Sequence, residues 1–230
     1  YAQAKKMEEV ACITLPSAMN QVLFPLYSQM QHDKEGIRRM LSLNTKMIAF
    51  VIFPLMTILI IVAEPLILFL FGDKWMDSVF YFQVLCIGGY FCSLQYFNYL
   101  AVAAIGESRT LFYAGLFKSI FLITTMLIGV HFCMEAVLLA MVLSNIINYF
   151  TNAVIAEKYI RYRVLDQMRD VAQILLISLI IGGIVYAIQY YINVNWILIA
   201  ITYSILYITI NSLVKNEVTM LVKNFIKKRC

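Results

Sequence analysis

The chain consists largely of long apolar runs that follow one another with short polar connections. The hydrocarbon core of a bilayer is about 30 Å thick, and a helix needs about 20 apolar residues to cross it. Because the runs are this long and do not alternate between polar and apolar residues, they predict membrane-spanning helices and not the strands of a barrel. We count seven such spans, at about residues 10–30, 47–71, 78–105, 110–132, 134–156, 171–192 and 194–214.

The composition excludes a water-soluble domain. Hydrophobic residues make up 62% of the 230 residues and charged residues 13%, whereas soluble domains average about 45–50% and about 25%. Too few polar residues remain to cover a surface in contact with water. We therefore predict an all-α, polytopic membrane helix bundle with about seven transmembrane helices. The first span is the weakest of them, because it is amphipathic and contains two prolines.

The basic residues are distributed unevenly between the two sides of the predicted bundle. Fourteen of the 18 lysines and arginines lie on one side, in the segments 31–46, 106–109, 157–170 and 215–230. The other side holds three, Lys5, Lys6 and Lys74. Since cytoplasmic connections are enriched in lysine and arginine, we predict a cytoplasmic C-terminus. A basic cytoplasmic rim is ordinary for such a protein, so we expect membrane lipids and no nucleic acid as partners.

We expect the chain to divide into a lobe of five spans over residues 1–156, a basic cytoplasmic loop over 157–170, a terminal helix pair over 171–214 and a basic cytoplasmic tail over 215–230. The chain begins with tyrosine, and no basic segment with a cleavage site precedes the first span. We therefore expect it to be the C-terminal part of a longer protein.

Two charged residues lie deep within predicted spans, where a charge is costly and often functional. Lys118 follows Arg109 by nine residues, about 13 Å into the membrane, and Glu64 precedes Gly72 by eight, about 12 Å from the other side. Lys118 is a candidate to hold an anionic headgroup, although it could instead extend to the interface or form a structural ion pair. Glu64 is a candidate partner for it, unless Pro65 begins a short interfacial helix that leaves the carboxylate in water.

Uncharged polar residues form stripes on two of the spans. Gln21 shares one face of the first span with Thr14, Ser17 and Ser28, and the fifth span carries Asn145, Asn148 and Asn152 at helical spacing. Such stripes either line a polar cavity or form hydrogen bonds between helices. We include Gln21 and the three asparagines with Lys118 and Glu64 as candidate substrate-binding residues.

The sequence contains no pattern typical of an enzyme. Neither histidine lies near a group of cysteines or carboxylates, and there is no phosphate-binding loop of the ATPase type. The five cysteines lack the spacing of metal ligands. We therefore expect a transporter with no catalytic residues, no metal and no cofactor.

Several stretches, spread over residues 10–125, resemble one family. They are "NQVLFPLYSQMQHDKEGIRRML", "PLMTILIIVAEPLILFLFGDKWMDSVFYFQVLCIGGYF" and "AIGESRTLFYAGLFKSI". In this order and spacing the chain resembles the C-terminal half of bacterial O-antigen and capsule polysaccharide exporters. These are flippases of lipid-linked oligosaccharides within the multidrug/oligosaccharidyl-lipid/polysaccharide superfamily.

The resemblance implies a two-lobed transporter of about fourteen helices that works by alternating access, of which this chain is the second lobe plus two terminal helices. The expected activity is the export of undecaprenyl-diphosphate-linked repeat units across the bacterial inner membrane, for lipopolysaccharide, capsule or exopolysaccharide. The family's cationic cavity residues support Lys118 as a contact for the diphosphate. Three alternatives stay open: a cation-coupled multidrug exporter, a membrane-embedded polysaccharide polymerase, and a scaffold that does not transport.

Overall fold

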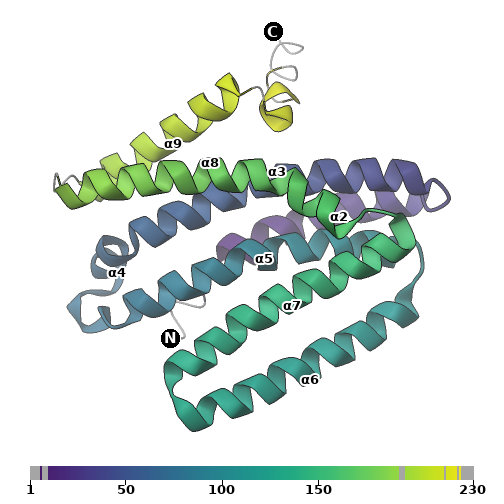
Figure 1. The fold of residues 1–230 in the computed structure, drawn as a ribbon, viewed down its shortest axis with the longest axis horizontal. Helices are drawn as coiled ribbons and strands as arrows, with labels where there is room; N and C mark the ends of the chain where they lie inside the picture. Colours follow the sequence, from purple (N-terminus) through teal and green to yellow (C-terminus); the bar gives the residue numbers. More distant parts are fainter. Residues whose placement is uncertain (1–5, 7–9, 192–194, 215, 222, 224–230) are drawn as a thin grey trace.

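The computed structural model describes residue 6 and residues 10–191, 195–214, 216–221 and 223, all of whose regular elements are helical. Much of the predicted basic tail, and residues 1–5, lie outside these ranges. The elements are a short π-helix η1 (Val10–Thr14), α2 (Leu15–Gln29), α3 (Lys34–Ile61), α4 (Ala63–Phe71), a 3-10 turn η2 (Asp73–Trp75), α5 (Ser78–Ala104), α6 (Ser108–Phe132), α7 (Met134–Ile160), α8 (Val164–Tyr191) and α9 (Trp196–Leu213) (Figure 1).

Within the described ranges, six helices are long and apolar enough to cross a membrane, namely α3 and α5 to α9. The first predicted span corresponds to η1 followed directly by α2. The prediction of an all-α membrane bundle with about seven helices is therefore confirmed, and the chain is a multi-pass membrane protein.

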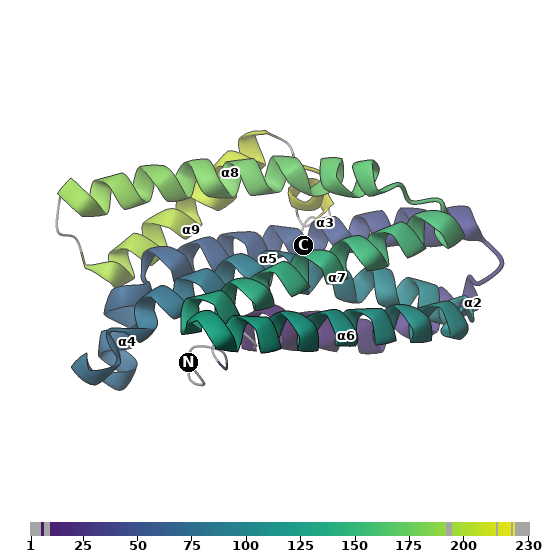
Figure 2. The same cartoon turned by 60° about the horizontal axis from the view of Figure 1, so that its bottom comes forward.

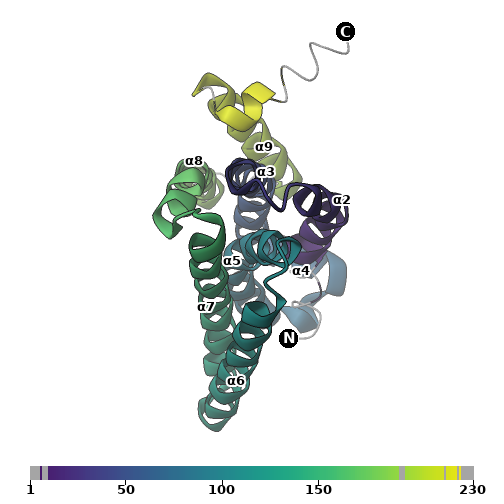
Figure 3. The ribbon, with the colours of Figure 1, turned by 90° about the vertical axis from the view of Figure 1, so that its right-hand side faces the viewer.

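The long helices run back and forth along one another. The connections α2–α3, α5–α6 and α7–α8 lie at one end of the bundle (Figure 1). We call it the basic end, because it carries Arg38, Arg161 and Arg163. Helix α5 packs against α2, α3 and α7, α8 packs against α3, and α9 packs against α8. Seen end-on, α9 and α6 lie at opposite edges of the molecule (Figure 3).

The predicted span 47–71 is two helices and not one. Helix α3 ends at Ile61, and α4 turns away from it at the end opposite the basic end (Figure 2). Pro65 explains the break, since it has no N–H to donate to the carbonyl of Ile61. The new helix begins its hydrogen bonding at Val62, whose carbonyl accepts from the Leu66 N–H at 2.9 Å.

The charged connections at the basic end are shorter than the sequence suggested. The segment 157–170 is helical except for residues 161–163, and α3 already begins at Lys34. Local caps explain both boundaries. The Asp33 side chain accepts a hydrogen bond from the Gly36 N–H at 2.9 Å, which starts α3. Arg161 ends α7 in the left-handed conformation, with φ of 62°.

A proline inside α3 is compensated by a tyrosine from a distant helix. Pro54 lacks the N–H that would bond to the carbonyl of Phe50, and a free carbonyl within a membrane is costly. The Tyr207 hydroxyl of α9 donates to that carbonyl at 3.1 Å. The proline therefore creates an acceptor that fastens α9 to α3.

This arrangement predicts that Tyr207→Phe destabilises the protein by about 1–2 kcal/mol, because it leaves the Phe50 carbonyl without a partner. In a Pro54→Ala background α3 regains its own backbone hydrogen bond, and the same substitution should cost much less. The free energy of unfolding in an SDS titration of all four proteins measures the difference. Equal costs in both backgrounds would contradict the compensation.

A chain of buried hydroxyl groups joins four helices in the interior. Thr57 of α3 bonds to Tyr90 of α5 at 2.8 Å and to Ser178 of α8 at 2.7 Å. Ser178 continues to Tyr203 of α9 at 2.7 Å. Thr57 also donates to the Phe53 carbonyl of its own helix. Helices α8 and α9 are thus attached to α3 and α5 by side-chain hydrogen bonds as well as by apolar packing.

Candidate functional site

Lys118 lies in a pocket bounded by four helices. The pocket has a volume of about 570 Å³ and is open on one side. We call it the charged pocket; its lining residues are Ser17, Asn20, Gln21, Gln95, Tyr96, Tyr99, Leu100, Lys118 and Asn152. They come from α2, α5, α6 and α7, so the site requires residues far apart in the sequence.

The ammonium group of Lys118 has polar and aromatic neighbours. Its Nζ donates to Oδ1 of Asn152 at 2.9 Å and lies 5.9 Å from the centre of the Tyr99 ring. Among the described residues, the ion pairs of the structure do not include Lys118. A half-buried ammonium without a carboxylate partner favours an anion in the pocket.

Asn152 holds the lysine in place. The asparagine is 2% exposed, and its Nδ2 donates to the Gln95 carbonyl of α5 at 3.3 Å. Its amide oxygen is thereby directed at Lys118. The amide bridges α5 and α6, so the position of the charge depends on the packing of three helices.

The structure brings some predicted site residues together and separates others. Gln21, Lys118 and Asn152 line the charged pocket. Asn145 and Asn148 line a second pocket of about 220 Å³ next to it, which we call the amide pocket. Glu64 lines neither: it is exposed in the first turn of α4. Its predicted depth assumed one continuous helix, and the structure instead has the short helix beginning near Pro65 that was the alternative.

Five residues that line the charged pocket were missed in the sequence: Asn20, Gln95, Tyr96, Tyr99 and Leu100. Gln95 and Tyr99 are four residues apart and therefore lie on one face of α5, which was a usable signal. Two polar residues in a long apolar run do not, however, reveal which helix they face. Of the described residues, no three His, Cys, Asp or Glu side chains are grouped as a metal site.

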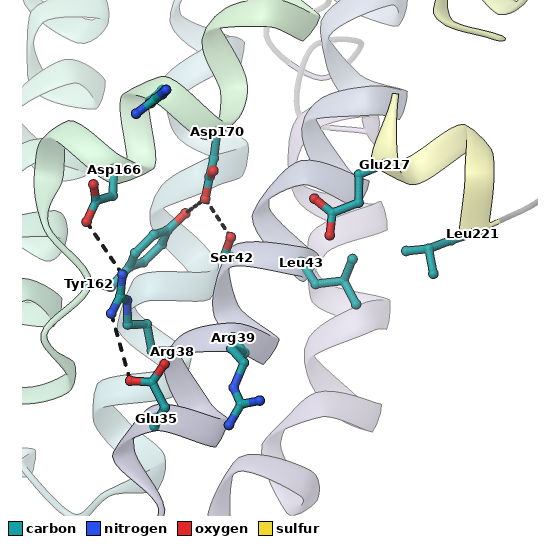
Figure 4. A pocket seen from close by; sticks show the side chains of 11 residues that line it. Glu35, Arg38, Arg39, Ser42, Leu43, Tyr162, Asp166, Asp170, Glu217 and Leu221 are labelled. Carbon is teal, nitrogen blue, oxygen red and sulfur yellow. Dashed lines mark hydrogen bonds and ion pairs between the residues drawn. The ribbon is translucent and has the colours of Figure 1, made fainter. Parts of the chain in front are cut away.

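A third pocket, at the basic end, is lined by charged residues. It has a volume of about 610 Å³ and lies between the start of α3, the start of α8 and the segment after α9. Figure 4 shows Asp170 directed at Tyr162 and Ser42, and Arg38 between Glu35 and Asp166. Lys46 pairs with Asp170 at 3.3 Å and with Glu217 at 2.7 Å.

We call this group the basic-end cluster; its charged members are Glu35, Arg38, Arg39, Lys46, Asp166, Arg169, Asp170 and Glu217. Among the described residues four carboxylates face four cations, so this part of the cluster has no excess of either charge. Its ion pairs link α3 to α8 and to the segment after α9. The cluster therefore favours a role in attaching the terminal helices to the lobe, and not a role in binding an ion.

Tyr162 is the buried member of the basic-end cluster. The side chain is 1% exposed, and its hydroxyl donates to Oδ2 of Asp170 at 2.6 Å. Burial, reinforced by the neighbouring Asp170 carboxylate, raises the pKa of the Tyr162 phenol far above its ordinary value. The phenol therefore stays protonated, and remains a donor, throughout the physiological range.

We expect Tyr162→Phe to lower the free energy of unfolding by about 1.5–3 kcal/mol, the usual contribution of a hydrogen bond to a charged group. Because the pKa is raised in the folded state, this contribution is fully present below about pH 10, the ordinary phenol value. It is lost as the pH rises through the raised pKa. Unfolding curves at pH 7 and above pH 10 test this, with the exposed Tyr113→Phe as control. If both variants behave like the wild type, the hydrogen bond has no such role.

Comparisons with known proteins find relatives whose names refer to polysaccharide biosynthesis. Residues 1–80 match the model of a family described as polysaccharide biosynthesis protein. The chain is 36% identical over 75 residues to the succinoglycan biosynthesis transport protein ExoT of Rhizobium meliloti, which is 33% of this chain and 15% of that protein. It is 24% identical over 171 residues to the lipopolysaccharide biosynthesis protein WzxC of Escherichia coli, which is 70% of this chain and 34% of that protein.

The teichuronic acid biosynthesis protein TuaB of Bacillus subtilis is 29% identical over 113 residues, 49% of this chain and 23% of that protein. Among solved structures, the lipid II flippase MurJ in an inward closed conformation matches with a TM-score of 0.70 at 20% identity. That match covers 92% of this chain and 46% of MurJ.

The predicted resemblance to the bacterial polysaccharide exporters is confirmed by these matches. The likeness to MurJ shows that the chain has the fold of about half of the MurJ chain. The chain spans less than half of the length of each of these relatives.

Proposed function

We propose that the protein exports lipid-linked oligosaccharide repeat units for surface polysaccharide. The substrate class is a sugar unit on undecaprenyl diphosphate, moved from the cytoplasmic to the outer leaflet of the inner membrane by alternating access. This chain supplies the second lobe and two terminal helices, and the first lobe lies elsewhere in the full protein. The names of the relatives, which refer to polysaccharide biosynthesis and to a flippase, support this proposal.

One observation in the structure carries the proposal: Lys118 lies beside uncharged amides in an open pocket and has no carboxylate partner among the described residues. A diphosphate has the charge and the hydrogen-bond acceptors to pair with it. Asn20, Gln21 and Gln95 supply further amides around the same space. These groups hold and release a headgroup without any covalent step, so the proposed protein is a transporter and not an enzyme.

The proposed orientation places the basic end in the cytoplasm. The connections at that end carry the excess of arginine and lysine described above, as expected for cytoplasmic connections. The C-terminus is then cytoplasmic as well, because an even number of crossings, α8 and α9, follows the α7–α8 connection. In a variant whose native cysteines, among them the exposed Cys133, are replaced, a cysteine introduced at Arg163 should react with an impermeant thiol reagent only after the membrane is opened. Reaction in intact cells would overturn this orientation.

The proposal is tested by producing the full-length protein in a host that lacks its own flippase and that makes the matching repeat unit. Surface polysaccharide should return, as measured by gel staining of cell-surface extracts. A protein that is produced normally, restores no polysaccharide and instead protects cells from toxic cations would be a cation-coupled multidrug exporter, which would overturn the proposal.

A further inference from the structure

The amide pocket is a direct continuation of the charged pocket. The two share Gln95 and Tyr96 of α5 among their lining residues. The amide pocket lies further from the basic end, between η1, α5, α6 and α7. Its polar side chains are uncharged: Gln95, Tyr96, Ser144, Asn145 and Asn148.

Ser144 shows that this pocket is not simply a packed helix contact. The residue is 3% exposed, and its Oγ has no hydrogen-bond partner among the described residues. Buried hydroxyl groups are normally paired, with protein or with water. An unpaired hydroxyl beside a pocket of about 220 Å³ leaves a donor and an acceptor that a hydrogen-bonding molecule in this space would satisfy.

Two amides on the same wall are also unused. Within the described part of the chain, the side chains of Asn145 and Asn148 take no part in the hydrogen bonds of the structure. Each amide offers both donors and an acceptor. The pocket thus presents a hydroxyl and two amides, with no fixed charge, to whatever fills it.

Helix α7 sets the order of the groups along the bundle. Asn152, which binds Lys118, lies one turn from Asn148 and about 12 Å from Ser144 along the helix axis. A ligand with its anionic group at Lys118 therefore places its next chemical group beside Asn148. The volume equals that of about seven liquid waters, which accommodates one sugar ring but not an oligosaccharide.

We propose that the amide pocket is a subsite for the first sugar ring of the substrate, the ring attached to the diphosphate, and that it selects an uncharged sugar. The inference rests on the proposed function. Sugar hydroxyls are both donors and acceptors, and they match Ser144, Asn145 and Asn148 in chemistry. Among the described residues no cation lines this pocket, so a sugar carboxylate would be buried there without a partner, which is costly.

The test measures binding to the purified full-length protein in detergent, with two probes. One is a short polyprenyl diphosphate without sugar, and the other is the same diphosphate carrying one neutral hexose. Ser144→Val and Asn148→Leu should each weaken binding of the hexose probe by roughly three- to tenfold. Neither should change binding of the bare diphosphate. Ser144→Thr should preserve the wild-type preference, because it retains the hydroxyl.

A matched control is Thr209→Val on α9, which removes an exposed hydroxyl that bonds only to the Ile205 carbonyl of its own helix. It should bind both probes like the wild type. If Ser144→Val and Asn148→Leu also bind both probes like the wild type, while Lys118→Ala weakens both, the sugar subsite is overturned and the proposed function stands. If the wild-type protein binds neither probe, the proposed function itself fails.

Discussion

Lys118→Ala in the full-length protein should abolish surface polysaccharide at normal protein level. The substitution removes the ammonium group that donates to Asn152 and faces the charged pocket. Hydrogen bonds to a charged group contribute about 1.5–3 kcal/mol, so binding of the diphosphate should weaken by at least roughly tenfold. Complementation of a flippase-deficient host measures the result. Lys118→Arg, which retains the charge but not its geometry, should restore part of the activity.

Lys158 provides the control for this prediction. It is an exposed lysine on α7 whose Nζ lies 5.2 Å from the centre of the Tyr159 ring, so it has an aromatic neighbour as Lys118 does but lies outside the pocket. Lys158→Ala should retain full activity. If Lys118→Ala is equally active, the lysine is a structural cation and the charged pocket does not bind the headgroup.

Gly182→Ala should separate α8 from α3 and destabilise the protein, whereas Gly183→Ala should not. A methyl group on Gly182 would come within 2.5 Å of Cγ2 of Thr57. Thr57 cannot turn away, because its hydroxyl bonds to Tyr90, Ser178 and its own helix. Overpacking of this kind costs typically about 1–3 kcal/mol. An added methyl group on Gly183 meets nothing within 4 Å.

The stability of the two alanine variants is compared by the SDS fraction at which half of the protein is unfolded. Gly182→Ala should unfold at a lower SDS fraction than the wild type, and Gly183→Ala at the same or a higher one. A further double variant, Gly182→Ala with Thr57→Ser, removes the methyl group that clashes and should recover much of the loss. If Gly182→Ala matches Gly183→Ala, α8 does not pack on α3 as closely as described.

Hydropathy was sufficient to predict the helical bundle and the approximate positions of its spans, because each crossing needs a long apolar run. The helix ends were harder to predict. Charged residues such as Lys34 of α3 and Lys158 of α7 continue these helices beyond the apolar run, and a local cap at Asp33 or a left-handed residue at Arg161 then ends them. The break before Pro65 was visible only as an alternative, since Pro54 in the same run leaves α3 intact.

Only those residues of the candidate site that are unusual by themselves could be predicted from the sequence. Lys118 stands out because a cation within an apolar helix is rare. Its neighbours depend on which helices meet, and no local pattern shows that Gln95 of α5 lies beside Lys118 of α6. Glu64 attracted attention for the same reason as Lys118, yet its side chain is exposed and does not line the pocket.

The central claim is that the full-length protein moves a lipid-linked oligosaccharide across a bilayer with the help of Lys118. The direct measurement uses proteoliposomes that carry a fluorescent polyprenyl-diphosphate oligosaccharide and an impermeant quencher added outside. With wild-type protein, the quencher should reduce the fluorescence of lipid from both leaflets, because lipid that began in the inner leaflet is moved to the outer one. With Lys118→Ala, only the fluorescence of the outer leaflet should be lost. The claim would be contradicted if liposomes that contain folded wild-type protein lost the same fraction of fluorescence as protein-free liposomes.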